Sequence, residues 1–454
     1  MTSALLVAST PTSPSAPLAT APALTGGSPS PSSAASYLSG SPVPNPAAYN
    51  AQGKALAANA PAYTPADIAL LSATDIAAIA PSTIATWSSA QLQAISNAAT
   101  QGLTSAQIGS LSVGQVVGLR DVQIAAFTGS QISSLTTQQI ASLSPTRAAL
   151  IGGNVITDVQ GLTAKQIGAL STTQVAAFTP YQALTFTVAQ VKAFSPAQIA
   201  ALDPKDIGAL NAGKIAALSV SQVKALSAAQ VADIGGNVIT DINGLTSSQI
   251  AALSTTQIKA LSPYQALTLS AAQVKAFSAT QIAALDPKAI GAFDGAKLAA
   301  LGTAQIKALT TAQVADIGGN IITDIQGLTS SQIAAFSPTQ LAAFSPYQAL
   351  NLTANQVKAF SAAQIAAIDP KGIGALDASK LAVLSTKQFA ALTTAQIADL
   401  GGNNIADLAG IQAPQLAILS LKQLGAFGAA QSSHFTSTQL HLLSTAQRTA
   451  LFHP

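Results

Sequence analysis

The most regularly spaced polar residue of this 454-residue chain is glutamine. From about residue 64 onward it returns every eight residues, as at Gln249, Gln257 and Gln265. A ladder of side-chain amides at fixed spacing is a candidate surface for binding a polymer or ice. However, the glutamine stands three residues after a Ser or Thr, which is the spacing of a helix capping box. We therefore interpret the glutamine ladder as a series of helix starts.

Lysine and tyrosine recur with a longer, 83-residue period. The candidate interaction rows that this period defines are Lys192, Lys275 and Lys358, then Lys214, Lys297 and Lys380, and finally Tyr181, Tyr264 and Tyr347. The lysines would form basic stripes if a superhelix brought successive repeats into register, or they are solvated charges offset by nearby aspartates. The tyrosines would form an aromatic binding row, or they are half-buried spacers.

Gly-Gly-Asn triplets form a fourth candidate row, which contains Asn154, Asn237 and Asn320. Each triplet opens an eleven-residue unit that also carries one aspartate, such as Asp241. Glycine-rich turns of this kind bind calcium when acidic ligands repeat, but one carboxylate per unit makes a weak site. Turn and cap roles are the favoured interpretation.

Residues for catalysis or metal binding are sparse. The three histidines, His434, His441 and His453, lie near the C-terminal end, and a third ligand for a metal site is not evident. The sequence shows no Ser-His-Asp order, phosphate loop or paired carboxylates. We expect no catalytic residue, no metal site and no cofactor.

The element that positions these side chains is an octad, [Leu/Phe]-[Ser/Thr/Asp]-x-x-[Gln/Lys]-[Ile/Val/Leu]-x-Ala. Prolines such as Pro263 follow the capping residue directly, where a missing N–H costs nothing, so the helix must restart in each octad. The Leu or Phe before the cap and the Ile or Val after the Gln form a hydrophobic staple. Each octad thus encodes a helix of about six residues that is stable only when stacked on its neighbours.

Nested repeats predict an all-α solenoid of very short capped helices. Nine octads and one eleven-residue unit make the 83-residue repeat. In the eleven-residue unit we expect a corner with a brief extended segment, as at residues 238–242. The expected domains are a disordered Pro/Ser/Ala-rich segment at 1–62, degenerate N-terminal repeats at 63–161, three regular repeats at 162–410 and a degenerate C-terminal cap at 411–454.

The composition is that of a neutral polar surface. Charged residues make up 8% of the chain, the net charge is +3 and cysteine is absent. Mean hydropathy is +0.41, yet polar residues interrupt every apolar run, so no transmembrane segment is expected. The first ten residues lack the basic start of a Sec signal, which leaves non-Sec export or a cytoplasmic location.

Two resemblances follow from these motifs. Residues 309–320 resemble the opening helix of transcription-activator-like effector repeats, but the period differs and the basic side chains that track phosphates are missing, so no nucleic-acid partner is expected. Residues 64–450 resemble the Leu-Thr-x-x-Gln-[Ile/Val]-x-Ala-Leu arrays of large secreted or surface proteins of proteobacteria. That resemblance implies an exported bacterial protein with a structural role.

The expected function is therefore a non-enzymatic scaffold at the cell surface or in a matrix, with a protein partner or self-association. One alternative is a secreted effector that binds a host protein along the solenoid. Another is a surface for ice or polysaccharide built from the Thr, Ser and Gln rows.

Overall fold

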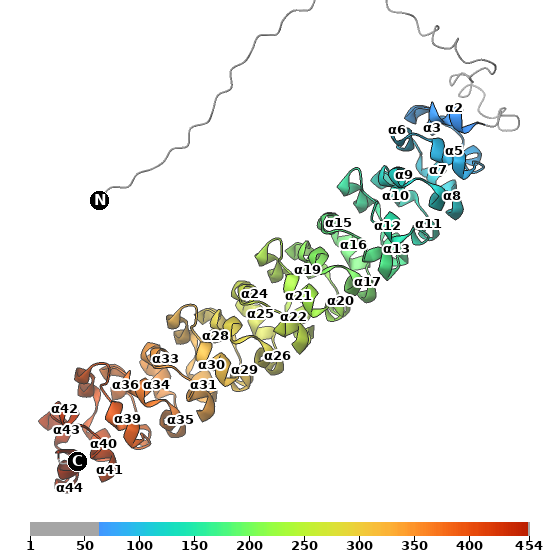
Figure 1. Cartoon of the computed structure of the whole chain (residues 1–454). Helices are drawn as coiled ribbons and strands as arrows, with labels where there is room; N and C mark the ends of the chain where they lie inside the picture. The colour runs from blue at the N-terminus through green and yellow to red at the C-terminus, as the bar shows by residue number, and fades with distance from the viewer. Residues whose placement is uncertain (1–62, 453–454) are drawn as a thin grey trace, which may run out of the picture. The chain divides into compact units, whose positions relative to one another are not determined.

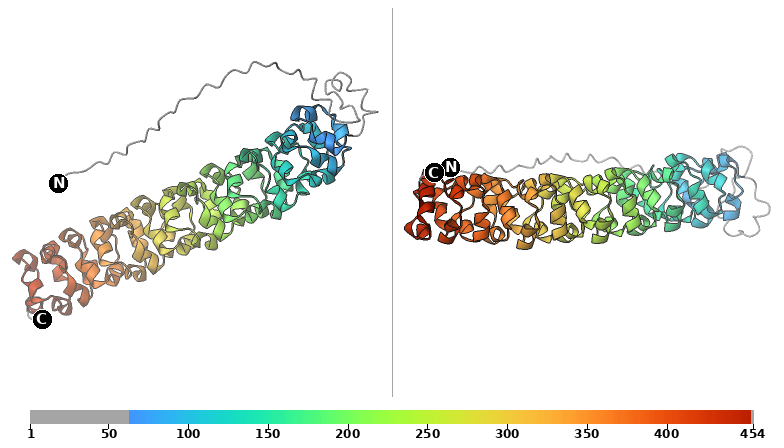
Figure 2. Two further views of the ribbon diagram at one scale, coloured as in Figure 1. Left: turned by 45° about the horizontal axis from the view of Figure 1, so that its top comes forward. Right: turned by 90° about the horizontal axis from the view of Figure 1, so that it is seen from below.

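The computed structural model describes residues 63–452. The segment 1–62 that was predicted to be disordered, and His453, lie outside the described residues. Within them the chain is all-α, with short α-helices, four 3₁₀ helices and no strand, as the octads predict. Figures 1 and 2 show the described helices advancing along one direction from α2 to α44.

The helices of the first regular repeat show the octad spacing. They are α13 (Ala164–Ala169), α14 (Thr172–Val175), α15 (Pro180–Thr185), α16 (Val188–Ala193), α17 (Pro196–Ala201), α18 (Pro204–Gly208), α19 (Ala212–Ala217), α20 (Val220–Ala225), α21 (Ala228–Asp233) and the 3₁₀ helix η4 (Ile239–Gly244). We call each such helix a unit of the stack.

The next two repeats start their helices at equivalent positions, one full repeat further along the chain each time. The first of these comprises α22 (Ser247–Ala252), α23 (Thr255–Lys259), α24 (Pro263–Thr268), α25 (Ala271–Ala276), α26 (Ala279–Ala284), α27 (Pro287–Gly291), α28 (Gly295–Ala300), α29 (Thr303–Ala308), α30 (Thr311–Asp316) and η5 (Ile322–Gly327). The second comprises α31 (Ser330–Ala335), α32 (Pro338–Leu341), α33 (Pro346–Asn351), α34 (Ala354–Lys358), α35 (Ala362–Ala367), α36 (Pro370–Gly374), α37 (Ala378–Ala382), α38 (Thr386–Ala390), α39 (Thr394–Asp399) and η6 (Ile405–Gly410).

The degenerate ends keep the same register although their sequences vary. On the N-terminal side lie α2 (Pro65–Ala69), α3 (Ala73–Ala78), α4 (Pro81–Ile84), α5 (Ser89–Ala94), α6 (Asn97–Thr100), α7 (Ser105–Ser110), α8 (Val113–Gly118), α9 (Asp121–Ala125), α10 (Gly129–Ser134), α11 (Thr137–Ala141), α12 (Pro145–Ala148) and η3 (Ile156–Gly161). On the C-terminal side lie α40 (Ala413–Ala417), α41 (Leu421–Leu424), α42 (Ala429–Ser432), α43 (Ser437–Leu440) and α44 (Thr445–Phe452). The loss of sequence pattern after residue 410 is therefore not a loss of helix spacing.

The predicted capping box is present at the start of α22. The Thr246 hydroxyl accepts from the backbone N–H of Gln249 at 3.3 Å, and the Gln249 Oε1 accepts from the backbone N–H of Thr246 at 2.6 Å. The staple residues lie in the core: Ile250 is fully buried and Leu253 nearly so. Repetition of this arrangement gives one continuous apolar core along the described stack.

The glutamine side chain has a second role that the capping box does not predict. The Nε2 of Gln249 donates to the carbonyl oxygens of Ile215 and Leu218, at 3.0 and 2.7 Å, in the unit four places earlier in the stack. Units three places apart also pack together, as α17 and α20 do. A superhelical turn therefore holds between three and four units, and the buried amides join one turn to the next.

The sequence contained a signal for this second role. All 16 acidic residues of the chain are aspartates, so the chain has no glutamate. A capping box accepts Glu as readily as Gln. Unlike a carboxylate, an amide also supplies a donor to a buried carbonyl, which explains why glutamine and never glutamate occupies the position in most units.

The last six residues of the eleven-residue unit form the 3₁₀ helix η4, so the brief extended segment predicted at residues 238–242 was wrong. Only Val238 is extended, with φ −138° and ψ 107°, before η4 begins. Gly235 has φ +82°, which favours glycine, and Gly244 leaves no room for a Cβ because the carbonyl oxygen of Ala212 would lie 2.2 Å from it. The glycines thus turn the chain and let two backbones touch.

Candidate functional site

The three predicted tyrosines are the most exposed aromatic side chains among the described residues. Tyr181, Tyr264 and Tyr347 are 76%, 76% and 74% exposed, so they are not half-buried spacers. They lie on α15, α24 and α33, which follow one another along the same edge of the stack in Figure 1. We call these three residues the tyrosine row.

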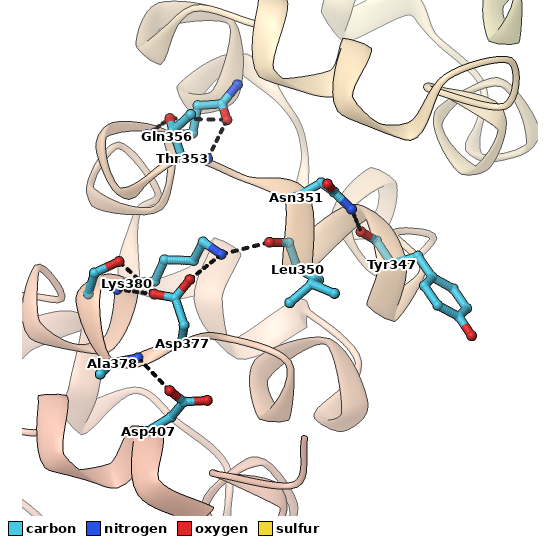
Figure 3. Close-up of polar contacts among 10 residues, drawn as sticks. Tyr347, Leu350, Asn351, Thr353, Gln356, Asp377, Ala378, Lys380 and Asp407 are labelled. Carbon is cyan, nitrogen blue, oxygen red and sulfur yellow. Dashed lines mark hydrogen bonds and ion pairs between the residues drawn. The ribbon is translucent and has the colours of Figure 1, made fainter. Parts of the chain in front are cut away.

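The octad frame explains why each ring points outward. In α15 the cap is Thr179, Pro180 takes the first helical position and Tyr181 the second, while Gln182 and Ala183 are buried. The side chain one turn after the tyrosine, Leu184, is 50% exposed on the same helix face. Figure 3 shows the equivalent Tyr347 ring extending away from α33.

The tyrosine row is confined to the three regular repeats. The equivalent helices in the flanking regions, α6 and α42, carry Ala98 and Ala430 at the tyrosine position. The helix start is kept in both flanking helices, so the tyrosine is not required to form the unit. Its recurrence is a property of the surface.

A shallow cleft joins Tyr181 to the Gly-Gly-Asn triplet at residues 152–154. Helix α15 packs against η3, three units earlier. The cleft between them is lined by Ala149, Ile151, Gly152, Gly153, Asn154, Ile156, Thr179, Tyr181 and Gln182. The structure therefore brings together two of the rows that the sequence singled out separately.

The same pairing of elements recurs in the next repeats, where α24 packs on η4 and α33 packs on η5. Exposed aliphatic side chains of the eleven-residue units accompany it. They are Val155, Ile156, Val238, Ile239 and Ile321. Each regular repeat thus presents an exposed tyrosine on a helix that packs against an eleven-residue unit with exposed aliphatic residues.

Two other candidate rows add little to the cleft. The asparagine row bonds to the stack through its backbone, and the first lysine row lies away from the Tyr181 cleft. The backbone N–H of Asn154 donates to the carbonyl oxygen of Ala125 at 3.1 Å, while its side chain is exposed. Lys192, Lys275 and Lys358 are exposed near the ends of α16, α25 and α34. None of these lysines lines the Tyr181 cleft, whose lining contains no Lys, Arg, Asp or Glu.

The second lysine row does not lie on the surface, which corrects its interpretation as an interaction stripe. Lys214, Lys297 and Lys380 are 8%, 6% and 7% exposed, because each takes the place of the buried glutamine. The Nζ of Lys214 donates to the carbonyl oxygen of Leu184 at 2.6 Å, at the end of the tyrosine helix α15. These lysines are structural donors and so cannot form a basic stripe.

Lys380 shows the same arrangement in Figure 3. Its Nζ lies 2.6 Å from the carbonyl oxygen of Leu350, in α33, and 2.7 Å from the Oδ2 of Asp377. Burial raises the pKa of Asp377, but hydrogen bonds from Lys380 and Ser379 outweigh burial and lower the pKa to about 2. The end of a tyrosine helix is thus held by an ion-paired lysine.

Asp206 is a buried acid that the sequence reading did not single out. It takes the glutamine position of α18, and its Oδ2 accepts from the backbone N–H of Asp203 at 3.0 Å. Its Oδ1 is buried without a hydrogen-bond partner. Burial raises the pKa of Asp206 to about 7, which makes this unit a weak point of the stack.

The aspartate of the eleven-residue unit stabilises the stack. Asp241 Oδ1 accepts from the backbone N–H of Ala212 at 2.9 Å, and Asp324 accepts in the same way from Gly295. His434 and His441 are exposed, and each contacts a carbonyl oxygen of its own helix region. Residues 63–452 contain no cluster of three His, Cys, Asp or Glu side chains that could hold a metal ion.

The comparisons with known proteins agree with a tandem repeat. The family model described as the ALTTAQ repeat matches residues 199–234 and 365–401, which occupy the same part of the first and third regular repeats. The letters of that description stand at residues 391–396. A search of curated proteins found no match. In the described part of the chain, no helix has the length and apolar character needed to span a membrane.

Proposed function

We propose that this protein is a non-enzymatic repeat scaffold that binds a partner protein along the tyrosine row. The observation that carries the proposal is the threefold recurrence of an exposed tyrosine on a helix packed against an eleven-residue unit. Tyrosine offers a large, rigid contact area with a polar end, which is why it is enriched at protein interfaces. Scattered single apolar residues need no such explanation, but a periodic set does.

The arrangement supports an extended partner rather than a compact one. Three equivalent sites on one edge allow several weak contacts to act together, because each later contact is intramolecular. The neutral lining of the Tyr181 cleft favours an uncharged contact segment, since a charged one would lose solvation without gaining an ion pair. The buried glutamines leave no amide ladder for ice or glycan on the outside.

We also propose that the protein is exported and acts at a bacterial surface or in a matrix. The support is the sparse charge, the absence of cysteine and the resemblance of the octads to arrays in secreted and surface proteins. Fractionation of the producing cells, with protease treatment of intact cells, tests this location. Recovery only in the cytoplasm would remove the proposal of export without affecting the tyrosine row.

Site-specific photocrosslinking tests the binding proposal. A photoreactive phenylalanine derivative is placed at Tyr264 in the full chain, and the matched control carries it at Val117, which is also exposed but lies outside the row. We expect a discrete crosslinked protein from position 264 only. Equal products from both positions, or a crosslinked glycan in place of a protein, would contradict a protein-binding row.

A further inference from the structure

The N-terminal units of the stack lack the glutamine that joins the turns. Helices α2, α3 and α4 carry Asp67, Asp75 and Thr83 at that position. Glutamine first appears in α5, where the Nε2 of Gln91 donates to the carbonyl oxygen of Tyr63 at 2.6 Å. The octad pattern itself starts near residue 64, so Gln91 is the first with an acceptor from the array within reach.

The aspartates keep the helix start but remove the donor. Asp67 Oδ2 accepts from the backbone N–H of Thr64 at 2.9 Å, and Asp75 Oδ2 accepts from that of Ser72 at 2.9 Å. A carboxylate completes the capping box as an amide does, but it repels the carbonyl oxygens that an amide would bind. Hydrogen bonds from Thr64 and Ser72 lower the pKa of both aspartates, so both are ionised at neutral pH.

At the C-terminal end, the carbonyl oxygens of one unit, α43, receive a donor from the last helix. Inside the stack, a glutamine four units later binds two carbonyl oxygens, as Gln249 binds those of Ile215 and Leu218. The corresponding carbonyl oxygens of α43 belong to Leu440 and Leu443. Arg448 of α44 donates to both, with Nη2 at 2.8 Å and Nε at 3.3 Å. Arg448 stands where the octad otherwise has Ile or Val.

We propose that these residues close both ends of the stack against head-to-tail addition of a second copy of the chain. A repeat stack whose turns are joined by identical bonds would otherwise extend from one copy into the next. At such a junction the incoming Asp67, Asp75 and Thr83 offer no amide donor. Two acceptors of the outgoing end are already taken by Arg448. If a second copy covered them, the carboxylates of Asp67 and Asp75 would also lose their hydration without gaining a partner.

The test restores the octad consensus at both ends of the full chain, with D67Q, D75Q, T83Q and R448I. Gln91 shows that glutamine forms the same capping box in this region, so the helix starts are kept. The control, D203N with D286N, removes two negative charges in mid-stack but keeps an N-cap side chain at each site. If the changes at one end cause misfolding, variants that carry only the N-terminal or only the C-terminal changes still test the other end.

Rod length in electron micrographs over a range of protein concentrations is the readout. We expect wild type and control to give rods one copy long, and the fully restored variant to give rods two or more copies long as concentration rises. Wild-type rods of several copies would overturn the proposal. Single-copy rods from a folded, fully restored variant would overturn it as well.

Discussion

The glutamine ladder inside the stack and the tyrosine row outside it repeat with different periods, and the difference separates structure from recognition. The glutamine recurs in most octads, is buried and, as at Gln249, makes both its capping bond and its bonds to the previous turn. The tyrosine recurs only once in each long repeat and is about three-quarters exposed. The glutamine therefore holds the stack together, whereas the exposed tyrosine is not needed to form its unit and offers a surface for contact.

Breaking the ladder should have the largest effect. Gln249→Leu leaves the buried carbonyl oxygens of Ile215 and Leu218, and the N–H of Thr246, without this partner. We expect a loss of about 3–5 kcal/mol in the free energy of unfolding, measured by urea denaturation. In this variant, amide hydrogen exchange should become faster in α19 and α22, the two helices that Gln249 joins.

Glutamate separates the two roles of the ladder. Gln249→Glu keeps the capping acceptor and removes the donor, so it should also destabilise the stack. Asp67→Glu, in a unit without a bond to an earlier turn, should be tolerated. A Gln249→Glu variant as stable as wild type would show that the amide bonds between turns are dispensable.

Asp206 is the place where the ladder can be strengthened. Asp206→Gln should raise the free energy of unfolding at pH 7 by about 1–3 kcal/mol, because the amide gains partners where the carboxylate has an unpartnered oxygen. The equivalent residue one repeat earlier is Gln123, which donates to the carbonyl oxygens of Leu92 and Ile95. The site therefore accepts a glutamine.

The pH dependence supplies a second readout for Asp206. Its pKa in the folded protein, about 7, exceeds the ordinary value of 3.8, so the folded state holds a proton that the unfolded state releases. The contribution of Asp206 to the free energy of unfolding is therefore fully present below about pH 4 and is lost as the pH rises to about 7. Asp206→Gln should remove that decline. If the free energy of unfolding of the variant still declines between about pH 4 and about pH 7 as in wild type, other groups cause the pH dependence.

The buried lysines should show a smaller effect. Lys380→Gln removes the hydrogen bond to Asp377, so the pKa of Asp377 should rise from about 2 toward its ordinary value, as followed by NMR titration. The Asp377 side chain is 43% exposed, so solvent screening limits the loss of stability to about 1 kcal/mol. Lys358→Gln, at an exposed site, is the matched control and should leave Asp377 unchanged.

The tyrosines should contribute least to stability. Tyr264→Ser is expected to change the free energy of unfolding by no more than about 0.5 kcal/mol, since the side chain is largely exposed. Thermal unfolding of the single and triple tyrosine variants checks this expectation. A loss comparable to that of Gln249→Leu would mean that the row belongs to the fold.

Much of the fold followed from the sequence because its determinants are local. The cap, the proline at the first position, the glutamine and the staple all lie within one octad, and the longer period placed every regular repeat. The burial of Lys214 was also open to prediction, because lysine there occupies the glutamine position. The extended segment predicted at residues 238–242 failed because the apolar residues there do not alternate in burial: Val238 and Ile239 are both exposed, and Ile242, one 3₁₀ turn after Ile239, is buried.

The site was predicted as separate rows and not as a cleft. Tyr181 and Asn154 belong to different units that are not neighbours in the sequence, and their meeting depends on how many units make a turn. Packing between turns sets that number, and one octad does not encode it. The bonds between turns were missed for the same reason, although the absence of glutamate pointed to a role for the amide.

The most direct test is the affinity of the crosslinked partner for wild type and for variants with one, two or three tyrosines replaced by serine. We expect the affinity to fall with each replacement, by about a hundredfold or more over the three, while the unfolding transition stays in place. An unchanged affinity in the folded triple variant would contradict the assignment of binding to the tyrosine row.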